Sequence, residues 1–349
     1  MDVKRVSEAL FETQETEQNL QTIIIPAPWN VADDIGSTAS TAPEHIAKCS
    51  REASLQNYRA PLRASHVVMA HMDQDWQAEN DRLRVQALDC LISRDTHAEC
   101  HRALRVEVDT LCQKLRNNIR KDASVLIGSG KTVGLLGGDC STPLGLLDAL
   151  AGFYNNFSLL HIGARCRLHA PSQLFECTPR HFMKHVLKMP FIPRITQVGM
   201  RTCTREEVQC MESEEGRWHP FDDDYMQSQT QKGIPWREVC ASVVETLSDR
   251  VYISFDLGAL AYYTCPNTAD PLPGGMSLYQ AMELIKQVEV AKKRLIGFDL
   301  CQVNPTAVER GFCQDVQMAT AILRRLVHVA GASFTRQHLP IVLESNEAV

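Results

Sequence analysis

The sequence predicts an α/β protein, a three-layer α/β/α sandwich with a central, mainly parallel sheet of about eight strands. Three observations predict it: short apolar runs recur along the chain, segments of helical period separate them, and glycine-rich or polar loops follow them. Runs of this length suit strands buried on both faces. With 349 residues and 44% hydrophobic side chains, one large core is expected in a single domain over 21–335, between an N-terminal extension (1–20) and a C-terminal tail (336–349).

The strands are expected where the apolar runs lie. In chain order these runs are 22–28, 65–70, 132–137, 157–162, 196–200, 251–257 and 294–300. Because helical segments alternate with them, the strands are expected to run parallel, with helices on both faces of the sheet.

Three segments carry the period of an amphipathic helix. Thr142 and Ser277 are the expected N-caps of the first two, and Pro143 suits a first turn. Gly331 is the expected stop of the third. The segments are 141–153, 277–291 and 315–331.

One polar and acidic region, 204–235, interrupts this alternation. We expect it to be a surface excursion rather than a separate domain. Its acidic run, Asp222 to Asp224, is most simply a solvated loop.

Composition excludes several classes of partner. The net charge is −6 without a long basic run, so nucleic acid is not an expected partner. No apolar stretch approaches the ~20 residues that cross a bilayer, so no membrane association is expected. The first twenty residues lack the apolar core of a secretory signal and the chain ends without a peroxisomal signal, so a cytoplasmic location is expected. The 13 cysteines lack a disulfide-scaffold spacing, and reduced thiols are the default.

Four loops lie where ligands bind in such folds, beyond the carboxyl ends of the strands. They read GGDCS (137–141), GARCRLH (163–169), SFDLGALAYYTCPNTADPLPGG (254–275) and GFDLCQVNP (297–305). The glycines and prolines of the last two shape turns, which indicates that these loops keep a defined backbone.

In this order and spacing, the four motifs resemble those of the ureohydrolase superfamily of arginases, agmatinases and formiminoglutamases, and look most like arginase. The resemblance spans residues 22–330. It implies an arginase-like fold, a homotrimer, and in active members two manganese ions that bridge a hydroxide, which attacks a guanidinium carbon. Manganese requires carboxylate and imidazole ligands, and the two ions generate the hydroxide near neutral pH.

This chain departs from the family at five of the six metal-ligand positions. Only Asp256 is retained. Guanidinium groups stay protonated in proteins, so the two arginines among the replacements are expected to pair with Asp139 and Asp256 in place of metal cations. The replaced positions are Cys140, Gly163, Arg165, Arg167 and Gly258.

The substrate pocket that the resemblance implies is also altered. Gln302 stands where arginases carry a glutamate that helps to hold the guanidinium, and Arg180 where they carry a proton-shuttling histidine, with His181 beside it. Asp139 and His169 complete this set. Arginines in a cleft favour an anionic group over a cationic guanidinium.

Cys140 has three functional interpretations besides a small buried residue that fills the space of a lost histidine. It is a candidate thiol nucleophile, because an arginine and a helix start nearby lower a thiol pKa. A reversible disulfide is a second interpretation, as Cys140–Cys166 or Cys265–Cys301. A soft metal site of Cys140, Cys166 and His169 is a third, which the neighbouring arginines oppose. His161, on a buried strand, is expected to be a core residue.

These observations predict a catalytically inactive arginase-like protein, with no cofactor, no dimanganese site and no hydrolysis of L-arginine. A ligand-binding or regulatory role is expected, with a small anionic ligand or a regulatory protein as partner. The alternative is a metal-independent thiol hydrolase that acts on a guanidino or amidino compound through Cys140. A structural protein with an unused pocket is a third hypothesis.

Overall fold

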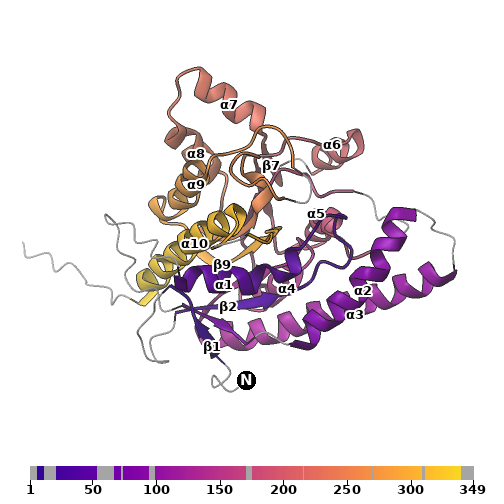
Figure 1. Ribbon diagram of the computed structural model, residues 1–349. Coiled ribbons are helices and arrows are strands. Elements are labelled where there is room, and N and C mark those ends of the chain that lie inside the picture. Colours follow the sequence, from indigo (N-terminus) through magenta and orange to yellow (C-terminus); the bar gives the residue numbers. More distant parts are fainter. Residues whose placement is uncertain are drawn as a thin grey trace, which may run out of the picture.

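A nine-stranded sheet forms the centre of the computed structural model, in the order β1-β3-β2-β4-β9-β8-β5-β6-β7. Eight strands are parallel to their neighbours, and β1 pairs antiparallel with β3. Helices cover both faces, so the predicted three-layer sandwich is confirmed (Figure 1). The structure describes residues 6–11, 21–52, 67–71, 74–93, 99–169, 175–214, 216–268, 271–308 and 311–338.

Seven strands form within a residue or two of the predicted apolar runs, and two were not predicted. β1 belongs to the expected extension 1–20, yet it pairs with β3. β7 lies in the expected excursion 204–235 and extends the sheet at its other edge. The strands are β1 (Val6–Ala9), β2 (Thr22–Ala27), β3 (Val67–Ala70), β4 (Thr132–Gly137), β5 (Ser158–Ile162), β6 (Arg194–Val198), β7 (Trp218–Phe221), β8 (Arg250–Asp256) and β9 (Arg294–Cys301).

Two apolar cores lie on the two faces of the sheet, because successive strand residues point to opposite sides. One core packs against α1 (Ala42–Glu52), α8 (Trp236–Glu245), α9 (Leu278–Val290) and α10 (Gln314–His338). The other packs against α2 (Gln74–Ser93), α3 (Glu99–Gly128), α4 (Leu144–Ala151) and α5 (Phe182–Leu187). Figure 1 shows α2 and α3 as a long pair at one end. Two further helices, α6 (Arg205–Glu212) and α7 (Asp223–Gln231), flank β7.

The predicted helix signals have mixed outcomes. Ser277 caps α9 in a capping box with Gln280, as expected. Thr142 does not cap α4; its hydroxyl donates to the Asp139 carbonyl at 2.8 Å instead. Gly331 does not stop α10, which continues to His338. A glycine costs a helix only ~1 kcal/mol, and the packing of α10 on α1 and α9 outweighs this cost.

The acidic run is not the solvated loop that we expected. Asp222 caps α7, accepting from the Tyr225 backbone N–H at 2.7 Å. Asp223 is buried and accepts from the backbone N–H of Gly275 at 3.0 Å. The run therefore ties α7 to the 271–275 turn.

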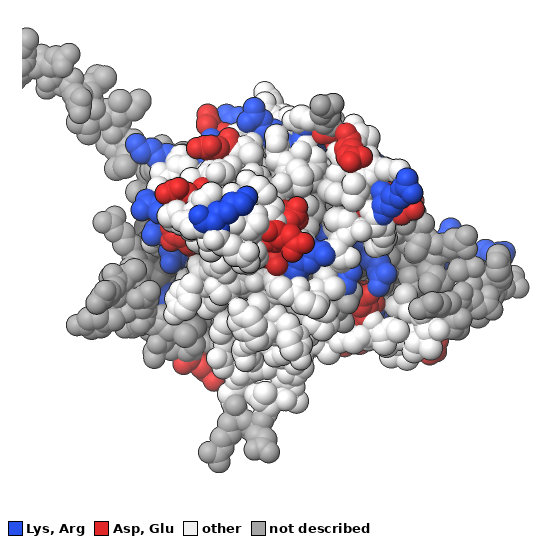
Figure 2. Space-filling model, turned by 90° about the horizontal axis from the view of Figure 1, so that it is seen from above, with Lys and Arg blue, Asp and Glu red and all other residues white. Residues whose placement is uncertain are grey.

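Among the described residues, no helix has both the length and the apolar character to cross a bilayer. On the face seen in Figure 2, acidic and basic side chains alternate over short distances, without a broad area of one sign. The backbone of α10 extends to His338, three residues into the expected tail 336–349. The rest of that tail, 339–349, lies outside the described residues.

Candidate functional site

A cleft of about 140 Å³ opens beyond the carboxyl ends of the sheet, beside the 163–169 loop. It brings together both predicted arginines of that loop with Arg180 and His169. Its lining residues are Asp34, Arg165, Cys166, Arg167, His169, Arg180, Thr202, Thr204 and Glu207. Three guanidinium groups and one imidazole thus share this cleft with two carboxylates.

Arg167 and Asp256 form a buried ion pair beside the cleft. The Arg167 Nη2 lies 2.6 Å from the Asp256 Oδ2, and the two side chains are only 6% and 3% exposed. The other oxygen, Oδ1, accepts from the backbone N–H of Gly258 at 2.8 Å. Burial acts to raise the pKa of Asp256, but the Arg167 guanidinium outweighs it and holds that pKa below its ordinary value. The predicted pairing of an arginine with Asp256 is therefore confirmed.

Asp139 does not pair with an arginine as predicted. Its Oδ1 accepts from the Ser141 backbone N–H at 2.7 Å and from the Ser141 hydroxyl at 2.6 Å. Its Oδ2 has no hydrogen-bond partner within the described part of the chain. Burial, together with the neighbouring Asp33 carboxyl, raises the pKa of Asp139 to about 7. A local turn has taken the place of the expected ion pair.

Asp33 belongs to the site, although the sequence analysis missed it. It is 1% exposed, and the Gln302 Nε2 lies 3.3 Å and 3.2 Å from its two oxygens. Burial and the adjacent Asp34 raise the pKa of Asp33. Its position could have indicated a role in the site, because it follows the carboxyl end of β2 by a few residues and ligands bind beyond such strand ends. Gln302 also ties two motif loops together, because its backbone N–H donates to the Gly138 carbonyl at 2.9 Å.

His161 is a core residue, as predicted, and it limits what position 163 can hold. Its Nδ1 lies 3.3 Å from the Ser254 hydroxyl, while its Nε2 has no partner among the described residues. Burial lowers the pKa of His161 to about 4, so the ring is neutral. A Cβ added at Gly163 would lie 2.7 Å from the His161 Nε2. An acidic side chain at 163 therefore requires His161 to move.

Of the remaining predicted residues, two line the cleft and one does not. His169 lines the cleft, with its Nε2 4.0 Å from the Glu207 Oε1. Arg180 also lines it and forms an ion pair with Asp34 at 2.5 Å. His181 does not line the cleft: it is buried, and its Nδ1 lies 2.9 Å from the Glu176 carbonyl oxygen.

Cys140 is buried against the ion pair, with its Sγ 3.7 Å from the Asp256 Oδ2. Burial raises the pKa of this thiol to about 11. A nucleophilic cysteine requires a lowered pKa, so the environment opposes thiolate formation. This chemistry favours the interpretation of Cys140 as a small buried residue.

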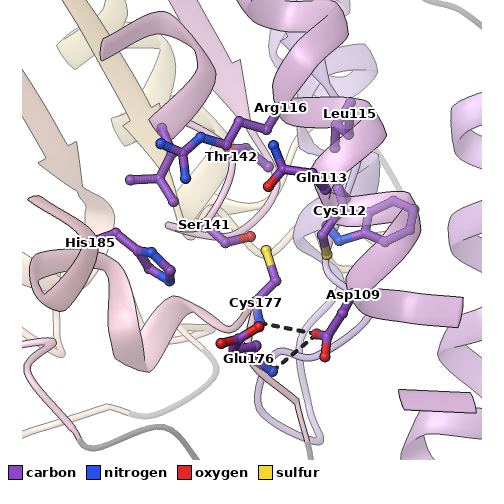
Figure 3. Close-up of a pocket in the computed structure, with 12 residues that line it drawn as sticks. Asp109, Cys112, Gln113, Leu115, Arg116, Ser141, Thr142, Glu176, Cys177 and His185 are labelled. Atoms are coloured by element: carbon purple, nitrogen blue, oxygen red, sulfur yellow. Dashed lines mark hydrogen bonds between the residues drawn. The ribbon is translucent and has the colours of Figure 1, made fainter. Parts of the chain in front are cut away.

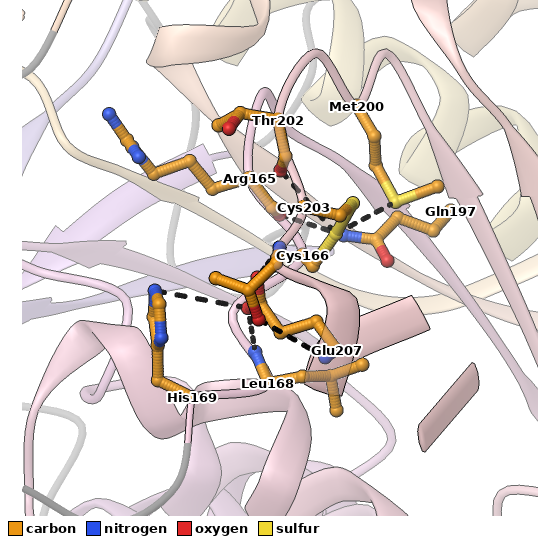
Figure 4. The surroundings of a disulfide bond; sticks show 10 residues. Arg165, Cys166, Leu168, His169, Gln197, Met200, Thr202, Cys203 and Glu207 are labelled. Atoms are coloured by element: carbon orange, nitrogen blue, oxygen red, sulfur yellow. Dashed lines mark hydrogen bonds and ion pairs between the residues drawn. A yellow bond between two sulfur atoms is a disulfide. The ribbon is translucent and has the colours of Figure 1, made fainter. Parts of the chain in front are cut away.

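A disulfide joins Cys166 and Cys203, whose Cα atoms lie 5.9 Å apart (Figure 4). The default of reduced thiols is therefore wrong for these two residues. The alternative disulfides Cys140–Cys166 and Cys265–Cys301 do not form, because Cys140, Cys265 and Cys301 are free thiols. The disulfide links the two segments that supply Arg165, Arg167, Thr202 and Thr204 to the cleft.

The soft metal site of Cys140, Cys166 and His169 does not form, because Cys166 is held in the disulfide. Within the described ranges, no three histidine, cysteine, aspartate or glutamate side chains come together in a way that could hold a metal ion.

Asp299 of β9 is a buried acid that lies opposite Ser254 of β8, whose hydroxyl donates to its Oδ1 at 3.1 Å. Burial raises its pKa from 3.8 to about 7. The folded state then binds the proton more tightly than the unfolded state, so the contribution of Asp299 to stability is greatest below about pH 4 and is lost as the pH rises through 7. We expect wild type to lose ~1–2 kcal/mol relative to Asp299→Asn between about pH 5.5 and 7, measured by urea unfolding. Parallel pH profiles for the two proteins would contradict the raised pKa.

The fold and the cleft together define a class of protein: a three-layer α/β/α protein with its ligand site beyond the carboxyl ends of a parallel sheet. The Arginase family model matches residues 20–328 of the chain. The chain therefore belongs to the arginase family.

Individual relatives agree with this assignment. An N(1)-aminopropylagmatine ureohydrolase of Thermus thermophilus is 29% identical over 187 residues, which are 54% of this chain and 60% of that protein. The chain thus spans about three fifths of the length of that relative. The crystal structure of an agmatine ureohydrolase of Thermoplasma volcanium has a TM-score of 0.67 at 16% identity, covering 95% of this chain and 97% of that one. The proclavaminate amidino hydrolase of Streptomyces clavuligerus has a TM-score of 0.66 at 15% identity, over 94% and 99% of the two chains.

Proposed function

We propose that this protein is a catalytically inactive member of the arginase family, which neither holds manganese nor hydrolyses L-arginine, and that its cleft binds a small anion. The observation that carries the proposal is the 2.6 Å contact of the Arg167 Nη2 with the Asp256 Oδ2. Asp256 is the one metal-ligand position that keeps its family residue, and a guanidinium takes up the oxygen that a metal would need.

The residues present do not fit two manganese ions. Arg167 brings a permanent positive charge to the site, and Arg165 lines the same cleft. Gly163 has no side chain to offer, and the space beside it is filled by His161. Cys140 supplies a thiol whose pKa is raised by burial, rather than an imidazole. This set of side chains therefore does not provide the ligands with which two manganese ions would generate a hydroxide.

The proposal is tested by measuring manganese content and urea release on the same samples. We expect wild type incubated with excess Mn²⁺ to retain no metal after desalting and to release no urea from L-arginine. Two manganese ions per chain with urea release from wild type would overturn the proposal.

A variant with the family ligands restored serves as the control for this assay. It carries Cys140→His, Gly163→Asp, Arg165→His, Arg167→Asp and Gly258→Asp together. We expect it to bind manganese, because the scaffold of strand-end loops is retained while the two positive charges are removed. Because an aspartate at 163 requires His161 to move, a second version of the variant also carries His161→Ala. If both versions fold and still bind no metal, the lost ligands do not explain the lack of metal in wild type.

The charge of the cleft supports an anionic ligand. Its two acids are already engaged: Asp34 pairs with Arg180, and Glu207 accepts from the Leu168 and Thr204 backbone N–H groups at 3.1 Å and 2.9 Å. Arg167 is balanced by Asp256, so Arg165 adds one further positive charge to the cleft, and the threonines of the cleft add hydroxyl donors. Such a set of donors suits a carboxylate or a phosphate.

Thermal unfolding in the presence of inorganic phosphate tests this part. A ligand that binds only the folded state at 100 times its Kd adds ~2.7 kcal/mol of stability, so the Tm should rise with phosphate concentration. Arg165→Gln should remove this rise, whereas Arg237→Gln, which changes an exposed arginine of α8, should keep it. An equal or larger rise with L-arginine would contradict an anion-selective cleft.

The assembly and the partner remain part of the proposal. The resemblance to arginases implies a homotrimer, which sedimentation analysis of the full chain checks directly. A regulatory protein partner is compatible with an inactive cleft. The alternative of a thiol hydrolase is not favoured, because Cys140 is 2% exposed and burial raises its pKa.

A further inference from the structure

A second cavity, of about 70 Å³, lies on the α3 side of the sheet and holds two cysteines. Cys112 comes from α3, and Cys177 comes from the segment that leads into the short 3-10 helix η4 (Pro179–His181). Figure 3 shows the two sulfur atoms facing each other across the cavity. Both cysteines are free thiols.

The backbone holds these two cysteines together. Asp109 accepts from the backbone N–H groups of Glu176 and Cys177, at 3.0 Å and 3.3 Å. Asp109 and Cys112 are three residues apart on α3 and therefore share one face of the helix. The Asp109 carboxylate thus holds the backbone of Cys177 beside Cys112. Burial and the contact with the Cys177 thiol raise the pKa of Cys112.

We propose that Cys112 and Cys177 form a reversible thiol–disulfide site that reacts with a low-molecular-weight disulfide of the glutathione class. The Cys177 thiolate attacks one sulfur of that disulfide, forms a mixed disulfide, and releases one thiolate. Cys112 loses its proton, and its thiolate attacks the Cys177 sulfur, forms the Cys112–Cys177 bond and releases the second thiolate. The two protein thiols lose two electrons and two protons, and the small disulfide is reduced to two thiols.

The order of the two steps follows from exposure. Cys177 is half-buried at the cavity, whereas Cys112 is 4% exposed. A small disulfide can therefore reach Cys177 first, and Cys112 then resolves the adduct from inside. The raised pKa of Cys112 makes this second step the slower one, because the thiolate is the reactive form.

The site is independent of the anion cleft, although the same segment reaches both. Cys177 precedes Arg180 by three residues, and Arg180 lines the cleft. A Cys112–Cys177 bond would fix this segment to α3. The Cys166–Cys203 disulfide fixes the middle of the 163–169 loop to a different segment, so peptide mapping separates the two cross-links.

The test starts from fully reduced full-length protein, which is treated with oxidised glutathione, blocked with an alkylating agent, digested and mapped by mass spectrometry. We expect a linked peptide pair that contains Cys112 and Cys177, which disappears on reduction. Persistent glutathione on Cys177 without this cross-link, or no modification of Cys177 at any glutathione ratio, would overturn the proposal. This measurement on wild type does not depend on the folding of any variant.

Three variants assign the roles. Cys112→Ser should leave glutathione on Cys177, because the resolving thiol is gone. Cys177→Ser should show neither the cross-link nor an adduct on Cys112. Cys210→Ser is the matched control, because Cys210 is also a half-buried free thiol but lies beside Lys184 rather than beside the pair. Loss of the cross-link in this control, or a glutathione adduct on Cys112 in Cys177→Ser, would contradict the assignment.

Discussion

Replacing Asp256 by alanine lowers the free energy of unfolding by ~3–5 kcal/mol, because it leaves the Arg167 guanidinium buried without a countercharge. The loss is large since the two side chains are almost inaccessible to water and form a 2.6 Å contact. Among the described residues, Arg167 has no ion-pair partner other than Asp256, and its Nε has no hydrogen-bond partner even in the wild type. Urea unfolding followed by tryptophan fluorescence measures the change.

An exposed ion pair is the matched control for this prediction. Arg82 contacts Glu79 and Glu107 at 2.7 Å each, but all three side chains are more than 40% exposed. Water screens such pairs, so Arg82→Ala should cost less than ~1 kcal/mol. Equal losses in the two variants would show that Arg167 and Asp256 do not behave as a buried pair.

Replacing Gln302 by glutamate, the residue that arginases carry here by resemblance, destabilises the protein by ~2–4 kcal/mol near pH 8. The change removes the amide donor that bonds both oxygens of Asp33 and places a second carboxylate about 3 Å from the first. Both side chains are at most 5% exposed, so the two acids cannot both ionise without a large cost.

The pH dependence distinguishes this cause from a simple packing defect. One acid of the new pair would have a raised pKa in the folded state, so the penalty should shrink as the pH falls from about 8 toward 5. Gln280→Glu is the matched control, because glutamate serves equally well at the third position of a capping box. We expect that variant to stay within ~0.5 kcal/mol of wild type. A Gln302→Glu loss that does not change with pH would point to packing instead.

The sequence predicted the central part of the sheet because its strands are continuous apolar runs, which are typical of strands buried on both faces. It did not predict β1 or β7, which are four-residue edge strands whose apolar residues are separated by polar residues or by histidine and proline. No helix was predicted between β3 and β4, where α2 and α3 lie. In α2, exposed Val85 and Ile92 interrupt the separation of apolar and polar faces, so the helical period is weak.

The sequence predicted the site residues that belong to a motif loop or to a position that the family resemblance assigns. Arg165, Arg167 and His169 were assigned to the site from the 163–169 loop, and Arg180 from the family resemblance; the structure brings all four together in one cleft. Asp33 was missed because it lies outside those motifs. The choice between a local turn and an ion pair at Asp139, and the choice of Cys203 as the partner of Cys166, depend on distances that a sequence does not contain.

The Arg167–Asp256 pair also changes how this part of the fold responds to its surroundings. A dissociable cation neutralises an acid only in proportion to its concentration in solution, whereas Arg167 is tethered to the chain and meets Asp256 at a fixed effective concentration. Neither chelators nor dilution can withdraw it. The charge that balances Asp256 at the end of β8 is therefore set once, when the chain folds, and does not depend on the metal ions in the medium.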